Sequence, residues 1–305
     1  MRSSRVIFEG GLEARSNEAS VWSFLPTQAT AGDFTSLGIE TSYGVRPILM
    51  IETHPSGMEL HIGLFSMEGR HPPNPIPSLD SVSSISLISQ FRSLKYVLGG
   101  VLYRCGQLAR QYAVTWRAFH ESFPLPSVQS DLVNFSLHGL QEHGYYEFDA
   151  LVTDVVRCYE TMRFPLWHAF GGKAALSKTG PRKGYERTLK ACEGLPAELS
   201  TYLNWDWDNF GTRANAYRDF IQHYFPLDRG FSQARMVRVR DNVWSGSMLI
   251  PDNPEERSPG RFRYDSDIDA LTFGWELTVQ LIKVVERVTT EIVAKTSNLT
   301  GRGDR

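Results

Sequence analysis

The sequence feature that most constrains the fold is a long apolar seam between residues 87 and 112. Its members alternate spacings of four and three, the heptad pattern of a helix that packs along its length. They are Leu87, Phe91, Leu94, Leu98, Val101, Cys105, Leu108 and Tyr112. The pattern predicts a helix that ends near Pro124. It packs inside a bundle of this chain or, as the alternative, against a second copy.

Composition narrows the class of protein. The chain has 305 residues, with 41% hydrophobic and 22% charged residues, as in globular proteins. Its net charge of −2 provides no general attraction to nucleic acid. The first residues lack the apolar run expected of a signal peptide, and no stretch has the apolar length expected of a membrane span. The three cysteines suggest no disulfide framework or zinc site. We therefore expect a reduced, cytoplasmic protein without membrane association, metal or cofactor.

The N-terminal region, residues 1–68, has the pattern of a small antiparallel β subdomain. Short apolar runs at 6–8, 21–25, 37–41, 47–52 and 58–65 are separated by Gly, Pro, Ser and Asn, which is typical of strands and turns. The last two flank a turn sequence and predict a hairpin. Ligand sensing, partner binding and structural cover all remain open as its role.

Four prolines within residues 69–82 exclude regular structure and mark a linker. Residues 83–296 then form a mostly α-helical domain, and residues 297–305 a flexible tail. Within the helical domain, residues 126–140 are a short helix or loop, and residues 147–164 are a second long helix. The fold class is thus α+β.

A β-hairpin interrupts the helical domain. Residues 236–240 alternate apolar and basic residues, and residues 243–250 provide a partner strand.

Three aspartates, Asp265, Asp267 and Asp269, precede the last helix. Carboxylates favour a helix N-terminus, so we expect capping there and no metal site.

The most distinctive stretch is 204–227. Phe210, Ala214, Tyr217 and Ile221 recur at helical spacing and predict one buried stripe. A polar row, Asn215, Asp219 and His223, steps by four along a different face. Asp206 or Asp208 is expected to cap the start of this helix, and Pro226 to end it.

An arginine, a polar residue, three further residues and a histidine make up the signature of the HEPN superfamily, and Arg218, Asp219 and His223 match it. The chain resembles HEPN proteins also in a long preceding helix, a short extended excursion afterwards and a final amphipathic helix. The resemblance covers at most about residues 80–296. Residues 163–168 show the same Arg–His spacing, but Pro165 is expected to exclude them from a helix interior.

The resemblance implies an all-α, HEPN-like bundle, here following the β subdomain and carrying the hairpin as an insertion. It also implies metal-independent RNA cleavage, in phage defence or a toxin system. In HEPN ribonucleases two copies of the motif meet across a dimer, so it implies a C2 homodimer with a composite cleft.

The residue types in the motif suit this chemistry. His223 is suited to proton transfer, Arg218 to the phosphoryl oxygens, and Asp219 to orienting the imidazole. Asn215 and Tyr217 are predicted to line or support the cleft.

Three arginines of the hairpin, Arg235, Arg238 and Arg240, are predicted either to contact RNA phosphates or to form a solvated strand face.

Two rival classes of function also remain open. One is a non-catalytic helical interaction module, such as an antitoxin-like or regulatory partner, and it predicts a buried, hydrogen-bonded His223 without an open groove at the symmetry axis. The other is an unrelated enzyme, although no Gly-x-Ser-x-Gly, His-Glu-x-x-His or dinucleotide motif is present.

Overall fold

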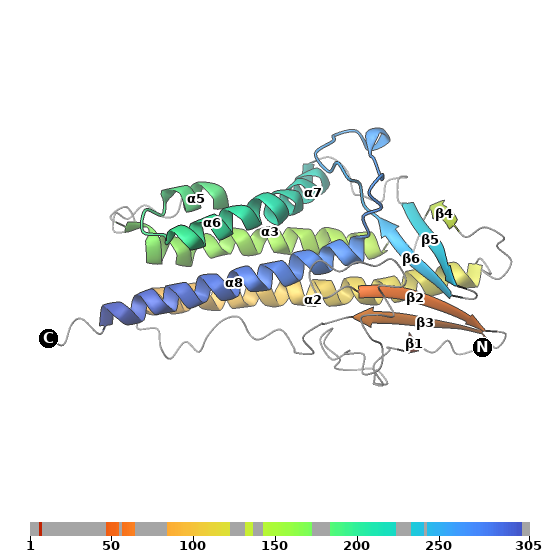
Figure 1. Ribbon diagram of the computed structural model, residues 1–305, viewed down its shortest axis with the longest axis horizontal. Coiled ribbons are helices and arrows are strands. Elements are labelled where there is room, and N and C mark those ends of the chain that lie inside the picture. Colours follow the sequence, from red (N-terminus) through yellow and green to blue (C-terminus); the bar gives the residue numbers. More distant parts are fainter. Residues whose placement is uncertain are drawn as a thin grey trace. The chain divides into compact units, whose positions relative to one another are not determined.

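The computed structural model of the protein (Figure 1) describes residues 6–7, 47–54, 57–64, 84–122, 132–136, 143–172, 184–223, 233–240 and 243–300. This part of the chain is mostly helical and contains a β-sheet, so the expected α+β class is confirmed. The helices are α2 (Ile85–Ser122), α3 (His143–Phe170), α5 (Tyr185–Ala191), α6 (Ala197–Asp206), α7 (Thr212–His223) and α8 (Ala270–Thr300). The strands are β1 (Val6–Ile7), β2 (Pro47–His54), β3 (Gly57–Leu64), β4 (Leu132–Ser136), β5 (Gln233–Arg240) and β6 (Val243–Leu249).

The chain divides into two compact units. Unit 1 contains the strands, α2 from Tyr103 onward, α3 as far as Leu151, α7 from Asp219 and α8 as far as Glu276. Unit 2 contains the remaining parts of these helices together with α5 and α6. The long helices thus contribute residues to both units.

The sheet of unit 1 has the strand order β1-β3-β2-β6-β5-β4. β2 and β3 form an antiparallel hairpin with Pro47 opposite Leu64, and β5 and β6 form a second antiparallel pair. Both predicted hairpins are confirmed. β2 also pairs with β6, with Met50 opposite Ser245, so the two hairpins share one sheet. Such long-range pairing leaves no local pattern in a sequence.

Other N-terminal predictions lie outside the described residues. These are the strands at 21–25 and 37–41 and the linker at 69–82. The division of the chain at that linker stays a prediction.

The expectation of a helix or loop over 126–140 was wrong where the structure describes it. Residues 132–136 form β4, which pairs antiparallel with β5 and places Asn134 opposite Arg235. A five-residue strand at a sheet edge is too short for its alternation to be distinguished from irregular sequence.

The apolar seam of α2 is confirmed as core. Each of its members, from Leu87 to Tyr112, is at most 3% exposed. The seam is therefore buried within a single chain, as the intramolecular alternative requires. At about 25 cal/mol per Å² of apolar surface, such burial is the main force that holds a helix of this kind in place.

α3 corrects the expectation about Pro165. The helix runs through Pro165 to Phe170, well beyond the predicted end at residue 164. An interior proline removes a hydrogen bond and costs about 3 kcal/mol. Leu166, Trp167 and Phe170 are buried beyond it, and burial of three large side chains offsets that cost.

The stretch around Asp206 also differs from expectation. α6 continues through a π-helical turn, Trp207–Gly211, directly into α7. Asp206 precedes the π-helical turn but makes no capping hydrogen bond with its side chain, and Asp208 lies inside the turn, so neither residue caps a helix start. The apolar stripe is largely confirmed, because Phe210, Ala214 and Tyr217 are buried.

Asp269 caps α8, as expected. Its Oδ2 accepts hydrogen bonds from the Thr272 amide at 2.9 Å and from the Thr272 hydroxyl at 3.0 Å. Such a bond satisfies an otherwise orphan donor of the first helical turn. α8 runs to Thr300, beyond the predicted end of the domain at residue 296.

Candidate functional site

The predicted catalytic residues lie on one continuous helix, α7. Arg218 and Asp219 are half-buried, whereas His223 is exposed and is the last residue of α7. Asn215 lies one turn before Asp219 and is half-buried. The polar row predicted from spacing therefore exists on a real helix and ends in a solvent-exposed imidazole.

Helix geometry determines how these side chains diverge. At roughly 100° per residue, Arg218 and His223 point about 140° apart, and at 1.5 Å per residue they are about 7.5 Å apart along the axis. The boundary between the two units falls within α7, between Arg218 and Asp219. An arginine side chain is long enough to reach around that helix toward the histidine end.

Buried rings anchor α7. Tyr217 is fully buried and Phe220 is 2% exposed. In unit 1, Phe220 meets Phe262 edge-on at 4.9 Å between ring centroids, a favourable aromatic geometry. Because its ring is buried, Tyr217 cannot line a cleft in this chain; of its two predicted roles, only support for the helix remains.

Arg235 and Arg238, the two arginines of β5 whose side chains the structure describes, do not form one patch. The Arg235 Nε donates to the Asn134 Oδ1 at 3.0 Å, and its guanidinium forms an ion pair with Asp267. Arg235 and Arg238 are three positions apart before the irregularity at residues 238–240, so they face opposite sides of the sheet. Both are half-buried. The side chain of Arg240 lies outside the described part of the structure.

A second Arg–His pair with the motif spacing also lies on a helix, α3. Arg163 is paired with Glu160 at 2.7 Å, and His168 is exposed. Arg163 is followed by Phe164 and not by a polar residue, so this pair lacks the position that Asp219 occupies in the first. It provides a natural control for the spacing alone.

Sequence reasoning missed a buried carboxylate in unit 2. Asp206 is fully buried, and its Oδ2 accepts a hydrogen bond of 2.7 Å from the Tyr159 hydroxyl. Its Oδ1 is buried as well, and the Gln280 side chain lies near enough to favour the charged carboxylate. Burial raises the pKa of Asp206 to about 6, while the bond from Tyr159 opposes the rise.

Aromatic rings surround this carboxylate. Tyr159, Tyr185 and Trp207 lie with ring centroids 5.2 Å apart in each pair. Such a cluster excludes water from Asp206, so the residue stabilises or strains the fold and is not open to a substrate. The sequence favoured a capping role for Asp206 because only its neighbours could be considered. Its actual partner, Tyr159, lies 47 residues away in the chain.

The cysteines are not reactive groups. Cys105, Cys158 and Cys192 are free and buried, and burial raises the pKa of Cys192 to about 11. Within the described ranges, no three His, Cys, Asp or Glu side chains are grouped so as to hold a metal ion. None of the described helices has the length and apolar character needed to cross a bilayer.

No family model, curated protein or solved structure matches this chain. No similarity of these kinds therefore indicates a function for the chain.

Proposed function

We propose that this protein is a metal-independent endoribonuclease of the HEPN type that cleaves single-stranded RNA. The observation that carries the proposal is the exposed His223 at the end of a helix that also bears Arg218 and Asp219. The proposal includes the finer fold: an N-terminal β subdomain followed by a HEPN-like bundle with the β5–β6 hairpin inserted in it.

The proposed reaction is an internal transfer at phosphorus. The ribose 2′-OH loses its proton to an imidazole base and its oxygen forms a bond to the adjoining phosphorus, while the bond from phosphorus to the 5′ oxygen breaks. The departing oxygen takes a proton from an acid. The products are a 2′,3′-cyclic phosphate and a 5′-hydroxyl, and no water or metal is consumed in the step.

Each residue has a role in this scheme. His223 transfers the proton, since imidazole is the side chain best suited to that task near neutral pH. Arg218 stabilises the charge that builds on the phosphoryl oxygens, because its planar fork binds two oxygens at once. Asp219 orients the imidazole from one turn earlier, and Asn215 supports the same row.

One chain supplies one histidine of this motif, whereas the reaction needs a base and an acid. We therefore propose a C2 homodimer in which two α7 helices supply both the base and the acid, as the HEPN resemblance implies.

Arg235, Arg238 and Arg240 remain candidates for phosphate contacts. Arg235 would first have to leave Asn134 and Asp267. A cytoplasmic role in defence or as a toxin, with a protein partner that restrains it, completes the proposal.

The exposure of His223 also supports this function over a non-catalytic interaction module. That alternative predicts a buried and hydrogen-bonded imidazole. In the single chain His223 is exposed, as a proton-transfer group that meets RNA must be.

The test is RNA cleavage in the presence of EDTA by the wild type and by matched variants. His223→Ala is expected to lower the rate about 10²- to 10⁴-fold, the usual contribution of general acid–base catalysis. Arg218→Ala is expected to lower it about 10²- to 10³-fold through lost charge stabilisation. His168→Ala, an exposed histidine with the same spacing from an arginine, is the control and should leave the rate unchanged.

Wild-type protein that is inert under these conditions would favour the interaction module. Cleavage that survives in His223→Ala would remove this residue from the mechanism.

A further inference from the structure

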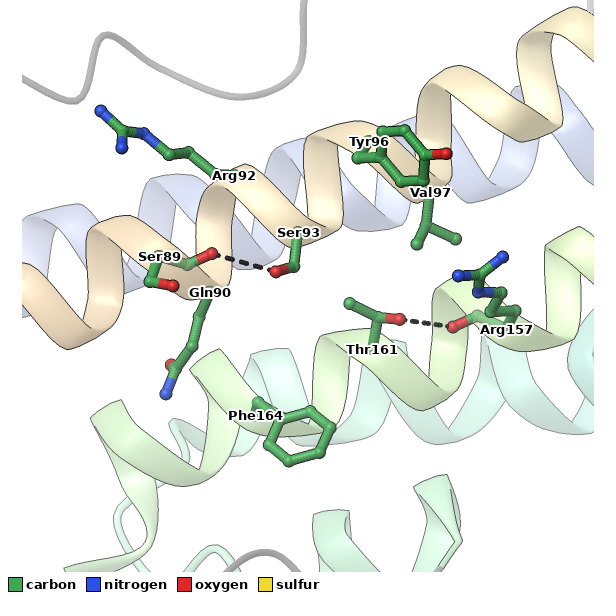
Figure 2. Close-up of a pocket in the computed structure, with 9 residues that line it drawn as sticks. All are labelled: Ser89, Gln90, Arg92, Ser93, Tyr96, Val97, Arg157, Thr161 and Phe164. Carbon is green, nitrogen blue, oxygen red and sulfur yellow. Dashed lines mark hydrogen bonds between the residues drawn. The ribbon is translucent and has the colours of Figure 1, made fainter.

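Unit 2 contains a groove between α2 and α3 that the proposed cleavage does not use (Figure 2). Its volume is about 660 Å³, within the roughly 300–1,000 Å³ typical of small-molecule sites. It is lined by Ser89, Gln90, Arg92, Ser93, Tyr96, Val97, Arg157, Thr161 and Phe164. None of these residues belongs to α7.

The groove is positively charged. Among the described residues its lining includes two arginines and no carboxylate. Figure 2 shows Arg157 extending from α3 near Val97, while Arg92 extends outward from the rim on α2. No ion pair of either guanidinium is present in the described part of the chain. The nearby Glu160 is already paired with Arg163. An anionic ligand would find these charges available.

Two aromatic rings are displayed along the same groove. The side chain of Tyr96 is 76% exposed and that of Phe164 is 45% exposed. Figure 2 shows Tyr96 near the Arg157 end of the groove and Phe164 nearer to Gln90. Rings left open to water beside cations suit a flat, conjugated ligand, because every nucleobase can stack on an aromatic face.

The polar groups of the groove can complete such a ligand's hydrogen bonds. Ser93 and Thr161 each donate a hydroxyl hydrogen to a carbonyl of their own helix, at 3.1 and 2.8 Å. Their oxygens therefore remain acceptors. The Oε1 of Gln90 is buried and has no partner among the described residues. A ribose hydroxyl or a base amino group would satisfy these acceptors.

We propose that the α2–α3 groove binds a nucleotide, with its phosphate at Arg157 and its base against the exposed rings. The nucleotide is either a free mononucleotide or one unit of an RNA strand, since both present the same phosphate and base. The site is independent of cleavage at α7, so its test does not require an active enzyme.

The experiment measures binding of two probes to the full chain by calorimetry or fluorescence anisotropy. One probe is adenosine 5′-monophosphate, and the other is a fluorescein-labelled 2′-O-methyl RNA strand, which cannot be cut through a 2′-hydroxyl. Arg157→Ala and Tyr96→Ala are each expected to weaken binding about tenfold or more, and added salt should weaken it further. Arg92→Ala should have a smaller effect, because that guanidinium lies at the rim.

The matched control is Arg187→Ala, which removes an exposed arginine of the same unit outside the groove. It should leave binding unchanged. Binding of the mononucleotide identifies a free nucleotide as the ligand, whereas binding of the strand alone identifies RNA. Failure of both probes, or an equal loss in Arg187→Ala and Arg157→Ala, would overturn the proposal.

Discussion

At the scale of single residues, Asp269 ties together three elements of unit 1. Its carboxylate accepts hydrogen bonds from the Tyr112 hydroxyl on α2 at 2.6 Å and from the Met248 amide on β6 at 2.9 Å. It also caps α8 through Thr272. Burial raises the pKa of Asp269, and these bonds oppose the rise. A buried carboxylate with so many donors is stable only while each donor is present.

Tyr112→Phe tests this network. The hydroxyl both donates to Asp269 and accepts from the Leu271 amide at 3.0 Å. Its loss leaves two buried polar groups with fewer partners, so we expect the free energy of unfolding to fall by about 1–3 kcal/mol. Urea unfolding measures the change. Tyr103→Phe, on the exposed side of the same helix, is the control and should change stability by less than about 0.5 kcal/mol.

Asp206 predicts a pH dependence of stability. Its pKa is about 6 in the folded chain against an ordinary value of 3.8, so the folded state holds its proton more tightly than the unfolded state. That contribution is fully present below about pH 3.8 and is lost as the pH rises through 6. At neutral pH the buried charge costs about 3 kcal/mol.

Asp206→Asn removes this titration. Relative to wild type, the variant should gain up to about 3 kcal/mol of unfolding free energy between pH 4 and pH 7. The difference in unfolding free energy between the two proteins, measured with denaturant at both pH values, removes the contributions of all other titrating groups. Equal pH dependence in the two proteins would mean that Asp206 stays charged in the folded chain.

At the scale of elements, local sequence patterns predicted those helices and strands that neighbouring residues specify. Elements that depend on contacts between distant residues were not predicted. The α2 seam and the β5–β6 pairing were predictable because period and turn chemistry lie in neighbouring residues. The β2–β6 pairing, the passage of α3 through Pro165 and the burial of Asp206 were not. Each depends on contacts with residues far away in the sequence.

The candidate site divides in the same way. Spacing alone placed Arg218, Asp219 and His223 on one helix, and the structure confirms the helix. The apolar spacing also predicted the burial of Tyr217, and that burial excludes the cleft-lining role predicted for the same residue. The exposure of the polar side chains could not be predicted, because it depends on what packs against α7. The α2–α3 groove could not be predicted, because its residues come from two helices that are far apart in the sequence.

Two glycines in long helices are expected to respond oppositely to alanine. At Gly274 of α8, an added Cβ would lie 2.7 Å from the Cδ2 of Leu151 and 3.1 Å from the Cδ2 of Leu108. Gly274→Ala should therefore destabilise the protein by about 1–3 kcal/mol through overpacking. At Gly99 of α2 nothing lies within 4 Å, and Gly99→Ala should stabilise it by about 0.5–1 kcal/mol through helix propensity. Thermal and urea unfolding report both signs, and a gain in Gly274→Ala would contradict the close packing of α8.

At the scale of the whole molecule, the proposed function requires two chains. A composite site predicts a mass near twice 34.5 kDa by light scattering. It also predicts that ribonuclease activity per chain falls on dilution, in step with dissociation to a single chain. Activity per chain that stays constant while the dimer dissociates would show that one α7 helix is sufficient.

The central claim is that His223 and Arg218 promote attack by the ribose 2′-OH. The most direct measurement is mass spectrometry of the RNA ends that the wild-type protein produces in EDTA. The proposed mechanism predicts 2′,3′-cyclic phosphate and 5′-hydroxyl termini, which disappear in His223→Ala. Fragments that carry 3′-hydroxyl and 5′-phosphate ends would contradict it, because those ends arise from attack by water and not by the ribose.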